Sequence, residues 1–565
     1  MSRPAARALL ALLLAPACVR AGDFHDWAPT PPMGWNSWDC FATTANEART
    51  EATADVMARE LAAHGWQYVV VDIQWYEPGS TGFAYNEKAK LAMDGYGRLV
   101  PAENKFPGSA GGRGFQALAT YVHARGLKFG IHLLRGIPRQ AVERNLPILG
   151  TSYHAADIAD RVRVCEWNQD MYGVDMSRPG AQAYYDSVFA LIASWGVDFV
   201  KVDDLSRPYI PNEPEVEAIR AAIDRSGRPM VLSLSPGETD LKAGDHAAAH
   251  ANMWRISDDF WDHWSLLEAQ FERLNQWSRF RRPGAWPDAD MIPIGMIDLG
   301  RPTWFSHDEQ VTLMTLWSIA RSPLILGADL TRLDEPTRAL LTNDEVLAVD
   351  QASADNRQLF RSANGGIGWI AKAPGGRDRY LALFNTRDPW VLSEEKRLWR
   401  SEPVSAATPG MSVAFKVAVN GLRTVVLVAD DSDHPRFWWP AVFKDVRWVL
   451  RDGRTLPAGR DYGSHGERRN SLEIPEGAAA LEGSAVLDEV AQKVRRDTMV
   501  FKAYGFTAAD VAARGQGVRV SVADLGLGSE VSIRDLWDHK DVGRVSGDFA
   551  PEVPWHGARL YRVSP

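Results

Sequence analysis

Two aspartates, Asp203 and Asp259, follow short apolar runs in the sequence, at positions where an acidic side chain could do chemistry. A pair of carboxylates at one site can hydrolyse a glycosidic bond, with one as nucleophile and the other as acid and then base. Lys201 precedes Asp203 by two residues, so on a strand both side chains point to the same side. The ammonium group would keep Asp203 ionised, as a nucleophile must be.

Asp259 must hold a proton near neutral pH if it is to act as the acid, which requires a raised pKa. Phe260, Trp261 and Trp264 flank it in the sequence. We expect these aromatic side chains to supply an apolar environment that disfavours the ionised carboxylate.

Further polar residues end other apolar runs of the chain. A single Asp after a strand is commonly the N-cap of the next helix, and Asp204 fits that simpler interpretation. Capping does not explain the whole set, because helix caps need no Lys, Arg or Trp beside them. The residues at these ends are Trp38, Asp72, His132, Lys201 with Asp203, Ser235, Arg255 with Asp259, and Asp288 with Asp290.

A metal site is the alternative use of such acidic residues. Asp203 with Asp204, or Asp259 with its acidic neighbours Asp258 and Asp262, could offer oxygen ligands. No His or Cys spacing supports a metal at these aspartates, and we expect no metal or other cofactor in the site.

The elements that must position these residues alternate along the chain. Short apolar runs are separated by amphipathic segments, and Gly65, Gly126 and Gly196 lie where helices should end. Eight such units within roughly 300 residues predict an α/β fold, a (β/α)₈ TIM barrel with active-site residues at the carboxyl ends of its strands. The expected strands are 32–38, 67–73, 127–134, 197–204, 229–235, 253–257, 288–292 and 323–328.

The bulk composition indicates a multidomain globular protein. The 565 residues are 45% apolar and 24% charged, with a net charge of −9 and no basic block. This composition disfavours nucleic acids and anionic membranes as partners, and the length predicts two or three domains.

Residues 1–21 have the pattern of an export signal, with arginines before the apolar run 8–17. We therefore expect a periplasmic or extracellular protein. Cys18 offers the alternative of a lipoprotein anchor. The mature chain then keeps Cys40 and Cys165, which could pair but do not make a disulfide framework.

Antiparallel β structure is expected after a catalytic barrel of residues 28–350. Alternating apolar and polar residues with glycine-rich turns predict a β-sandwich formed by 351–388 together with 503–565. Residues 389–502 read as a second β-sandwich inserted between those two segments.

The chain resembles glycoside hydrolase family 27, the α-galactosidase or melibiase group. The resemblance covers roughly residues 28–385 and the extreme C-terminus. The motifs that carry it are 31-PPMGWNSWDCF-41, 68-YVVVDIQW-75, 198-DFVKVDD-204, 254-WRISDDFWDHW-264, 283-PGAWPDADMIPIG-295, 307-HDEQVTLMTLWSIARSPLILGADL-330 and 534-RDLWDHKDVG-543.

The resemblance implies a barrel followed by an antiparallel β-sandwich, and hydrolysis with retention through a covalent glycosyl-enzyme. By position it makes Asp203 the nucleophile and Asp259 the acid/base, with Asp258 as a neighbouring decoy. The implied sugar-binding residues are Trp38 as a stacking platform, Lys201 and Arg255 as hydroxyl-binding cations, and Asp290 as a further carboxylate.

Several positions depart from the family pattern. The family usually has two adjacent aspartates after the second strand, which hold the 4- and 6-hydroxyls, whereas this chain has Asp72 and then Ile73. His132 replaces the usual tyrosine after strand three, and Ser235 replaces a carboxylate that helps bind the 2-hydroxyl. The family's disulfides near the site are also missing, since Gln74 and Leu205 occupy cysteine positions.

Ile73 bears on the identity of the sugar. β-L-Arabinopyranose has the ring stereochemistry of α-D-galactopyranose but lacks the exocyclic CH₂OH, so an apolar residue facing carbon 5 would suit it. The family includes β-L-arabinopyranosidases and isomaltodextranases. The simpler interpretation is that Ile73 points into the barrel wall and another residue binds the 6-hydroxyl.

Two insertions could add contacts. The segment 135–173 carries Arg135, Arg139, Trp167 and Asp170 over the expected rim, and long loops on this face are usually functional. The inserted 389–502 segment resembles a carbohydrate-binding module often attached to family 27 enzymes, and could bind glycan or brace the barrel.

We therefore expect a retaining exo-glycosidase that removes terminal α-D-galactosyl residues from an oligosaccharide or a polysaccharide side chain. β-L-Arabinopyranosidase or isomaltose-releasing activity with the same mechanism is the alternative. A sugar-binding pseudoenzyme is a third hypothesis, which the presence of both catalytic aspartates disfavours.

Overall fold

The structure is a computed structural model that describes residues 23–565 except 431–440, 459–461, 465–467, 488–497 and 512–514. The expected export signal, with Cys18, lies outside the described residues. Parts of the two segments on which the resemblance to a carbohydrate-binding module rests, 424–439 and 461–477, also lie outside them. In the described part of the chain, no helix has the length and apolar character needed to cross a bilayer.

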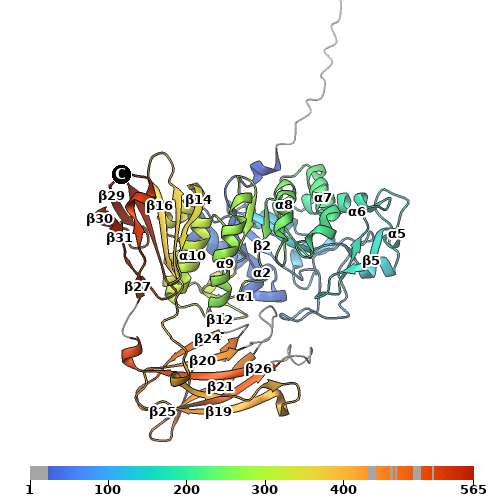
Figure 1. The fold of residues 1–565 in the computed structure, drawn as a ribbon. Coiled ribbons are helices and arrows are strands. Elements are labelled where there is room, and N and C mark those ends of the chain that lie inside the picture. The colour runs from blue at the N-terminus through green and yellow to red at the C-terminus, as the bar shows by residue number, and fades with distance from the viewer. Residues whose placement is uncertain (1–22, 431–440, 459–461, 465–467, 488–497, 512–514) are drawn as a thin grey trace, which may run out of the picture.

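Eight parallel strands form the N-terminal sheet, in the order β10-β9-β8-β7-β3-β2-β1-β13, and all eight expected strands are present (Figure 1). A parallel bridge between Ile292 and Leu326 joins the two edges of this curled sheet. The strands are β1 (Met33–Asn36), β2 (Tyr68–Val71), β3 (Lys128–Leu134), β7 (Phe199–Asp203), β8 (Val231–Leu234), β9 (Met253–Arg255), β10 (Trp286–Asp288) and β13 (Leu324–Leu326).

The seventh barrel strand lies two residues earlier than the sequence suggested. β10 ends at Asp288 rather than continuing through 288–292. The reason is local, because Asp290 has a φ of 87°, in the left-handed region that an extended strand cannot contain.

Helices cover the outer face of the sheet (Figure 1). Gly65 and Gly196 adopt positive φ where helical segments end, as their places in the sequence predicted. The principal helices are α2 (Glu47–Val56), α3 (Gln116–His123), α6 (Ala181–Ser194), α7 (Tyr209–Ser226), α8 (Gly244–His250), α9 (Trp264–Trp277), α10 (His307–Ala320), α11 (Glu335–Leu341) and α12 (Asp344–Ala352).

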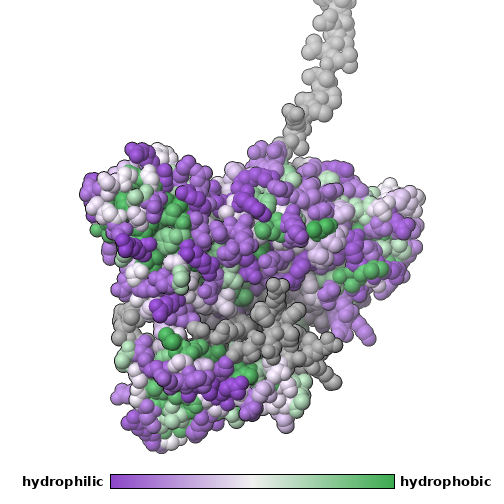
Figure 2. All heavy atoms as spheres, in the orientation of Figure 1, coloured by the Kyte–Doolittle hydropathy of each residue, from purple (hydrophilic) through white to green (hydrophobic). Residues whose placement is uncertain are grey.

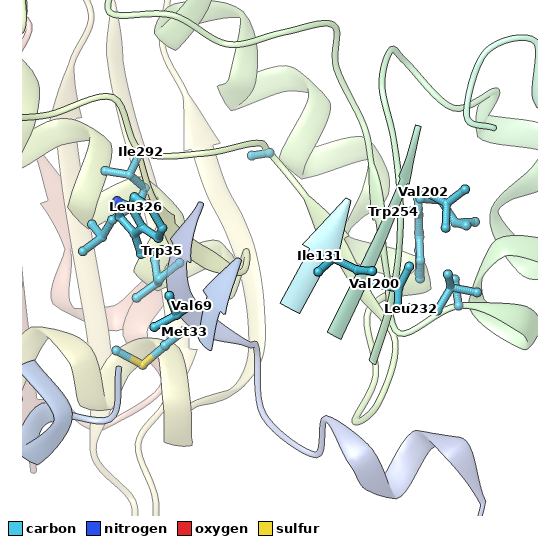
Figure 3. Packing of buried hydrophobic residues seen from close by; sticks show 14 of the residues in the cluster. Met33, Trp35, Val69, Ile131, Val200, Val202, Leu232, Trp254, Ile292 and Leu326 are labelled. Carbon is cyan, nitrogen blue, oxygen red and sulfur yellow. The ribbon is translucent and has the colours of Figure 1, made fainter. Parts of the chain in front are cut away.

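Alternate residues of each strand serve two different cores. Val69 and Val200 pack outward against the helices, in the large cluster shown in Figure 3. Tyr68, Val70 and Phe199 pack together in a second cluster inside the barrel. This alternation identifies which residues at the strand ends face the interior of the barrel.

The insertion after β3 forms a small subdomain of its own. It contains a three-stranded sheet in the order β4-β6-β5 and two short helices. Its elements are β4 (Ile137–Pro138), α4 (Arg139–Glu143), α5 (Ala155–Ile158), β5 (Ala159–Val164) and β6 (Met171–Val174).

After the barrel, a six-stranded antiparallel sheet combines residues from both ends of the C-terminal region, in the order β14-β15-β16-β33-β29-β30. It packs beside α10 (Figure 1). Its strands are β14 (Ala354–Arg361), β15 (Gly366–Lys372), β16 (Arg379–Asn385), β29 (Glu530–Asp535), β30 (Lys540–Ser546) and β33 (Ala558–Ser564).

Two further antiparallel sheets, built from the chain between β16 and β27 (Gly515–Gly517), enclose their own apolar core. This β-sandwich lies at the bottom of Figure 1. The face shown in Figure 2 is mostly hydrophilic over both the barrel and the sandwiches. The principal strands are β17 (Arg397–Arg400), β19 (Ser412–Ala418), β20 (Thr424–Asp430), β21 (Ala441–Leu450), β24 (Arg468–Glu473), β25 (Ala478–Leu487) and β26 (Thr498–Phe506).

Candidate active site

The end of β7 carries the predicted nucleophile on the inner side of the barrel. Phe199 faces the interior, and the two-residue period of the strand brings Lys201 and Asp203 to the same side. The Lys201 ammonium lies 3.7 Å from Oδ1 of Asp203 and 2.9 Å from Oδ2 of Asp72. The predicted cation beside Asp203 is therefore in place.

Asp203 is held in its ionised form. Burial opposes ionisation, but the charge of Lys201 and the hydrogen bond from His132 outweigh it and lower the pKa of the carboxyl. His132 Nε2 donates to Oδ2 of Asp203 at 2.9 Å. Oδ1 is buried, and no hydrogen bond of good geometry reaches it; the nearest cation is Lys201.

His132 and Ser235 lie behind Asp203 rather than in the wall of the cavity. The His132 side chain is fully buried, with its hydrogen bond directed at the carboxylate. Ser235 is also buried next to Asp203, and its hydroxyl has no partner of good geometry. Both were predicted to bind substrate, and the structure places them as neighbours of the nucleophile.

Asp72 directly follows β2, the second barrel strand. Its carboxylate lies in a dense network of hydrogen bonds. Its Oδ2 accepts from Asn36 at 2.7 Å and from Lys201 at 2.9 Å, and its Oδ1 accepts from the backbone N–H of Ile73 at 2.8 Å. Asn36, which the sequence did not single out, therefore fixes the carboxylate from β1.

Ile73 lines the cavity beside Asp72, and its side chain also packs in the large core cluster outside the barrel strands. The two-residue period of β2 turns Ile73 outward, and the strand ends at Val71, where the chain changes direction. The peptide bond between Ile73 and Gln74 is cis. Trp75 then packs in the core, where its Nε1 donates to the carbonyl of His132 at 2.7 Å.

The predicted acid/base, Asp259, also lines the cavity. Arg255 Nη2 donates to its Oδ1 at 3.1 Å and lies 2.8 Å from Oδ2 of Asp290. The predicted apolar enclosure is absent, because the Asp259 side chain is 46% exposed. Phe260 is buried against Trp317 instead of covering Asp259.

Trp264 does not enclose Asp259 either, because its ring stacks on His556. Trp261 lines the cavity. The half-exposed carboxyl of Asp259 is thus open for a bound substrate to cover.

Three buried carboxyls, those of Asp39, Asp288 and Asp290, lie in or near this site, and two of them, Asp39 and Asp290, line the cavity. Burial raises the pKa of Asp288 to about 6 and that of Asp290 to about 7, although Arg255 opposes both shifts. Burial also raises the pKa of Asp39 well above its usual range, and the Asp290 carboxylate adds to the shift. The sequence did not lead us to single out Asp39, although it lies next to Trp38 in the motif of residues 31–41.

Aromatic rings form part of the mouth. Trp38 stacks on Tyr85, with ring centres 6.1 Å apart, and Tyr85 contacts Trp167 of the insertion at 5.6 Å. Trp167 is 39% exposed. Tyr85 lies on a loop with no periodic pattern, so the sequence offered no signal for it.

The cavity that these residues share has a volume of about 610 Å³, within the range of small-molecule sites. Eight of the ten predicted site residues line it directly. They are Trp38, Asp72, Ile73, Lys201, Asp203, Arg255, Asp259 and Asp290.

The insertion is anchored by a buried ion network. Arg135 binds Asp204 Oδ2 at 2.7 Å and Glu215 Oε1 at 2.8 Å. The prediction that Asp204 caps the next helix is wrong, because α7 begins after Pro208 and Asp204 pairs with Arg135.

Two other residues of the insertion do not face the cavity. Asp170 is buried and accepts hydrogen bonds from Gln74 at 2.6 Å and from Tyr76 at 3.2 Å. Arg139 donates to the carbonyl of Met171 at 3.0 Å. Asp170 therefore supports the segment after β2, and only Arg135 and Trp167 of the four predicted residues line the cavity.

The acidic groups considered as metal ligands have cationic partners. Asp204 pairs with Arg135, Asp258 with Arg207, and Asp262 with Arg301. Asp72, His132 and Asp203 lie close enough to hold an ion, but the Lys201 ammonium already contacts both carboxylates. Cys40 and Cys165, the two described cysteines, are buried free thiols and do not pair.

Comparison with known families agrees with this geometry. The model of the α-galactosidase A family matches residues 30–178 and 173–352, and that of the α-galactosidase C-terminal β-sandwich domain matches residues 508–563. The chain is 29% identical to α-galactosidase 2 of Arabidopsis thaliana over 57% of its length and 67% of that protein. It is 28% identical to α-galactosidase A of Cellvibrio japonicus, over 67% and 81%.

Among solved structures, a family 27 β-L-arabinopyranosidase from Geobacillus stearothermophilus is similar over nearly the whole chain. The TM-score is 0.71 and the identity 39%, covering 96% of this chain and 98% of that one. The barrel, the paired aspartates and the match of the family model over more than half of the sequence lead to one conclusion: the chain belongs to the α-galactosidase family, glycoside hydrolase family 27.

Proposed function

We propose that the protein is a retaining exo-glycosidase that hydrolyses terminal α-D-galactosyl residues by double displacement. The observation that carries this proposal is the state of Asp203. Its carboxylate is kept ionised by Lys201 and His132, and Asp203 lines the same cavity as Asp259.

In the first step, a carboxylate oxygen of Asp203 forms a bond to the anomeric carbon while the bond from that carbon to the leaving oxygen breaks. Asp259 donates its proton to the leaving oxygen. In the second step, Asp259 takes a proton from water, the water oxygen bonds to the anomeric carbon, and the ester bond to Asp203 breaks. Two inversions give net retention.

The substrate completes the environment of Asp259. Its carboxyl is half exposed in the free enzyme and hydrogen-bonded to Arg255. A bound sugar displaces water from this side chain, and loss of water favours the protonated form that donates to the leaving group.

The polar wall of the cavity fits a galacto-configured ring. Asp72 and Lys201 form a donor–acceptor pair with fixed geometry, and Arg255 and Asp290 form another on the opposite side. Trp38 offers an aromatic platform for the apolar face of the sugar. These groups recognise ring hydroxyls, which α-D-galactose and β-L-arabinopyranose present in the same arrangement.

A specific observation favours β-L-arabinopyranosides as the second candidate substrate. Ile73 lines the cavity next to Asp72, where the family usually has a second aspartate that helps hold the hydroxymethyl arm. An apolar side chain there offers no hydrogen bond to a 6-hydroxyl and fits a ring that lacks it. The similar Geobacillus stearothermophilus protein is a β-L-arabinopyranosidase.

Paired nitrophenyl glycosides test both candidates. The enzyme is assayed with α-D-galactopyranoside and β-L-arabinopyranoside, and the first-formed anomer of each product is read by NMR before mutarotation. Release of either sugar with retained configuration supports the proposal. An inverted product, or no turnover of either glycoside, contradicts it.

We also propose that the protein is exported and meets its oligosaccharide or polysaccharide substrate outside the cytoplasm. The support is the signal-like sequence at residues 1–21. Mass spectrometry of the protein from its native host gives the mature N-terminus, and an intact leader would contradict export.

A further inference from the structure

A second group of potential ligands lies on the outside of the barrel, away from the catalytic cavity. Glu217 on α7 and His246 and His250 on α8 each offer a ligand atom, and the three atoms lie within 4.8 Å of one another. The histidines are four residues apart, so they share one face of their helix.

The geometry is close to that of a bound divalent ion. Nε2 of His246 lies 3.2 Å from Oε1 of Glu217, and two ligands of a tetrahedral zinc ion are separated by roughly 3.4 Å. The two imidazole rings lie 4.1 Å apart with an interplanar angle of 25°. The three ligand atoms therefore lie near enough to one another to reach a single ion.

Hydrogen bonds behind the rings select which nitrogen faces an ion. Nδ1 of His250 donates to the carbonyl of His246 at 2.8 Å, so Nε2 carries the lone pair. The buried hydroxyl of Tyr209 lies 3.0 Å from Nδ1 of His246. Partners of this kind orient metal-binding histidines in proteins.

The local charge separates this group from the similar one in the active site. There, the Lys201 ammonium lies 2.9 Å from Asp72 and occupies the place of a cation. Within the described residues, the ion pair of Glu217 is with His246, and no lysine or arginine pairs with it. The carboxylate is therefore free to balance part of the charge of an ion.

We propose that Glu217, His246 and His250 bind one divalent transition-metal ion of the zinc class. Two imidazoles and a carboxylate suit such an ion, and the open fourth position takes water. The ion links α7 to α8. These helices follow β7, which ends at Asp203, and β8, which Ser235 directly follows. Its role is to stabilise this side of the barrel rather than to take part in glycoside hydrolysis.

Zinc titration of the tag-free full-length protein tests the proposal after chelator treatment and dialysis. The wild-type chain is compared by calorimetry with H246Q/H250Q, with E217Q, and with the control H64Q. His64 pairs with Asp344 at 2.7 Å and belongs to no three-ligand group among the described residues.

We expect the double variant to bind one zinc ion fewer per chain than the wild type. E217Q should bind that ion more weakly by at least roughly tenfold, because loss of even an outer-shell partner typically has an effect of that size. H64Q should match the wild type. Cobalt substitution should give the intense d–d absorption of a four-coordinate ion in the wild type and lose it in H246Q/H250Q.

Equal zinc stoichiometry and affinity in the wild type and H246Q/H250Q would overturn the proposal. Glu217 is exposed, so E217Q keeps the test valid if the double variant fails to fold. Glycoside turnover should be the same in all variants, which separates this test from that of the proposed function.

Discussion

Two buried clusters in this chain place a cation between two carboxylates. At the strand ends of the barrel, Lys201 lies between Asp72 and Asp203. Where the barrel meets the C-terminal sandwich, the imidazole of His556 lies between Glu309 and Asp388. The same electrostatic arrangement serves two purposes.

The junction cluster is complete. The two ring nitrogens of His556 lie 2.8 Å from Glu309 and 3.0 Å from Asp388, and the ring stacks on Trp264 at 3.7 Å. Burial lowers the pKa of His556, but the carboxylates outweigh it and raise the pKa to about 9. Each polar atom of the imidazole has a partner, so the cluster joins segments of the fold.

The catalytic cluster is incomplete. Oδ1 of Asp203, Nδ1 of His132 and the hydroxyl of Ser235 are buried without hydrogen-bond partners. An unsatisfied buried polar group destabilises the fold, and such groups are rare in native proteins. Their concentration around Asp203 distinguishes this cluster from the junction cluster, in which both nitrogens of the imidazole have partners.

Removal of the nucleophile should have the largest effect. D203N keeps the shape of the side chain but cannot form the glycosyl ester, so we expect kcat to fall by roughly 10⁴-fold or more. Nitrophenyl glycoside turnover measures this, with circular dichroism as the control for folding. Turnover near the wild-type level would show that Asp203 is not the nucleophile.

Removal of the cation should have the next largest effect. K201M leaves Asp72 and Asp203 without their shared charge, and we expect kcat/KM to fall by roughly a hundredfold. Lys201 lowers the pKa of Asp203, so its loss raises that pKa. The acid limb of the kcat/KM profile should therefore move to higher pH. An unchanged acid limb would contradict the role assigned to Lys201.

Ile73 lies next to this cluster, and we expect its substitution to change the preference between two sugars more than the catalytic step itself. I73D restores a carboxylate that can accept a hydrogen bond from a 6-hydroxyl, so the kcat/KM ratio of galactoside to arabinopyranoside should rise by roughly tenfold to a hundredfold. I73V, which stays apolar, is the matched control. A ratio that is unchanged in I73D would refute this account of Ile73.

The smallest effect on catalysis should come from H556Q, in the cluster where the barrel meets the C-terminal sandwich. This substitution should alter the free energy of unfolding instead. The pKa of His556 is raised in the folded state, so its contribution is full below the unfolded value of about 6.5 and is lost as pH rises through about 9. H556Q should therefore lose up to about 3 kcal/mol of unfolding free energy near pH 6 and much less near pH 10. Urea titrations measure both, and a pH-independent loss would contradict the charged state of His556.

The strand ends were predictable because the information is local. A strand of period two places Phe199, Lys201 and Asp203 on one face whatever surrounds it. His132 and Arg255 were placed at the ends of their strands by the positions of the apolar runs. The repeat of apolar runs and helices also determined the barrel and the rim on which these side chains meet.

The tertiary structure decided what each inward residue contacts. Ile73 packs in the outer core cluster, as its place after β2 predicts, yet the turn beyond Val71 also brings it to the lining of the cavity. Asp259 has aromatic neighbours in the sequence, yet Phe260 and Trp264 pack elsewhere and leave it half exposed. The direction of a side chain beyond a strand depends on packing with distant segments.

The sequence by itself therefore determined the barrel, the two aspartates and the lysine, because strand periodicity is a property of consecutive residues. Only the tertiary structure decided the roles of Asp39, Tyr85 and Asp170, whose partners are far away in the chain. The physical reason is that burial and hydrogen bonding are set by all the elements packed around a residue, and no local pattern encodes them.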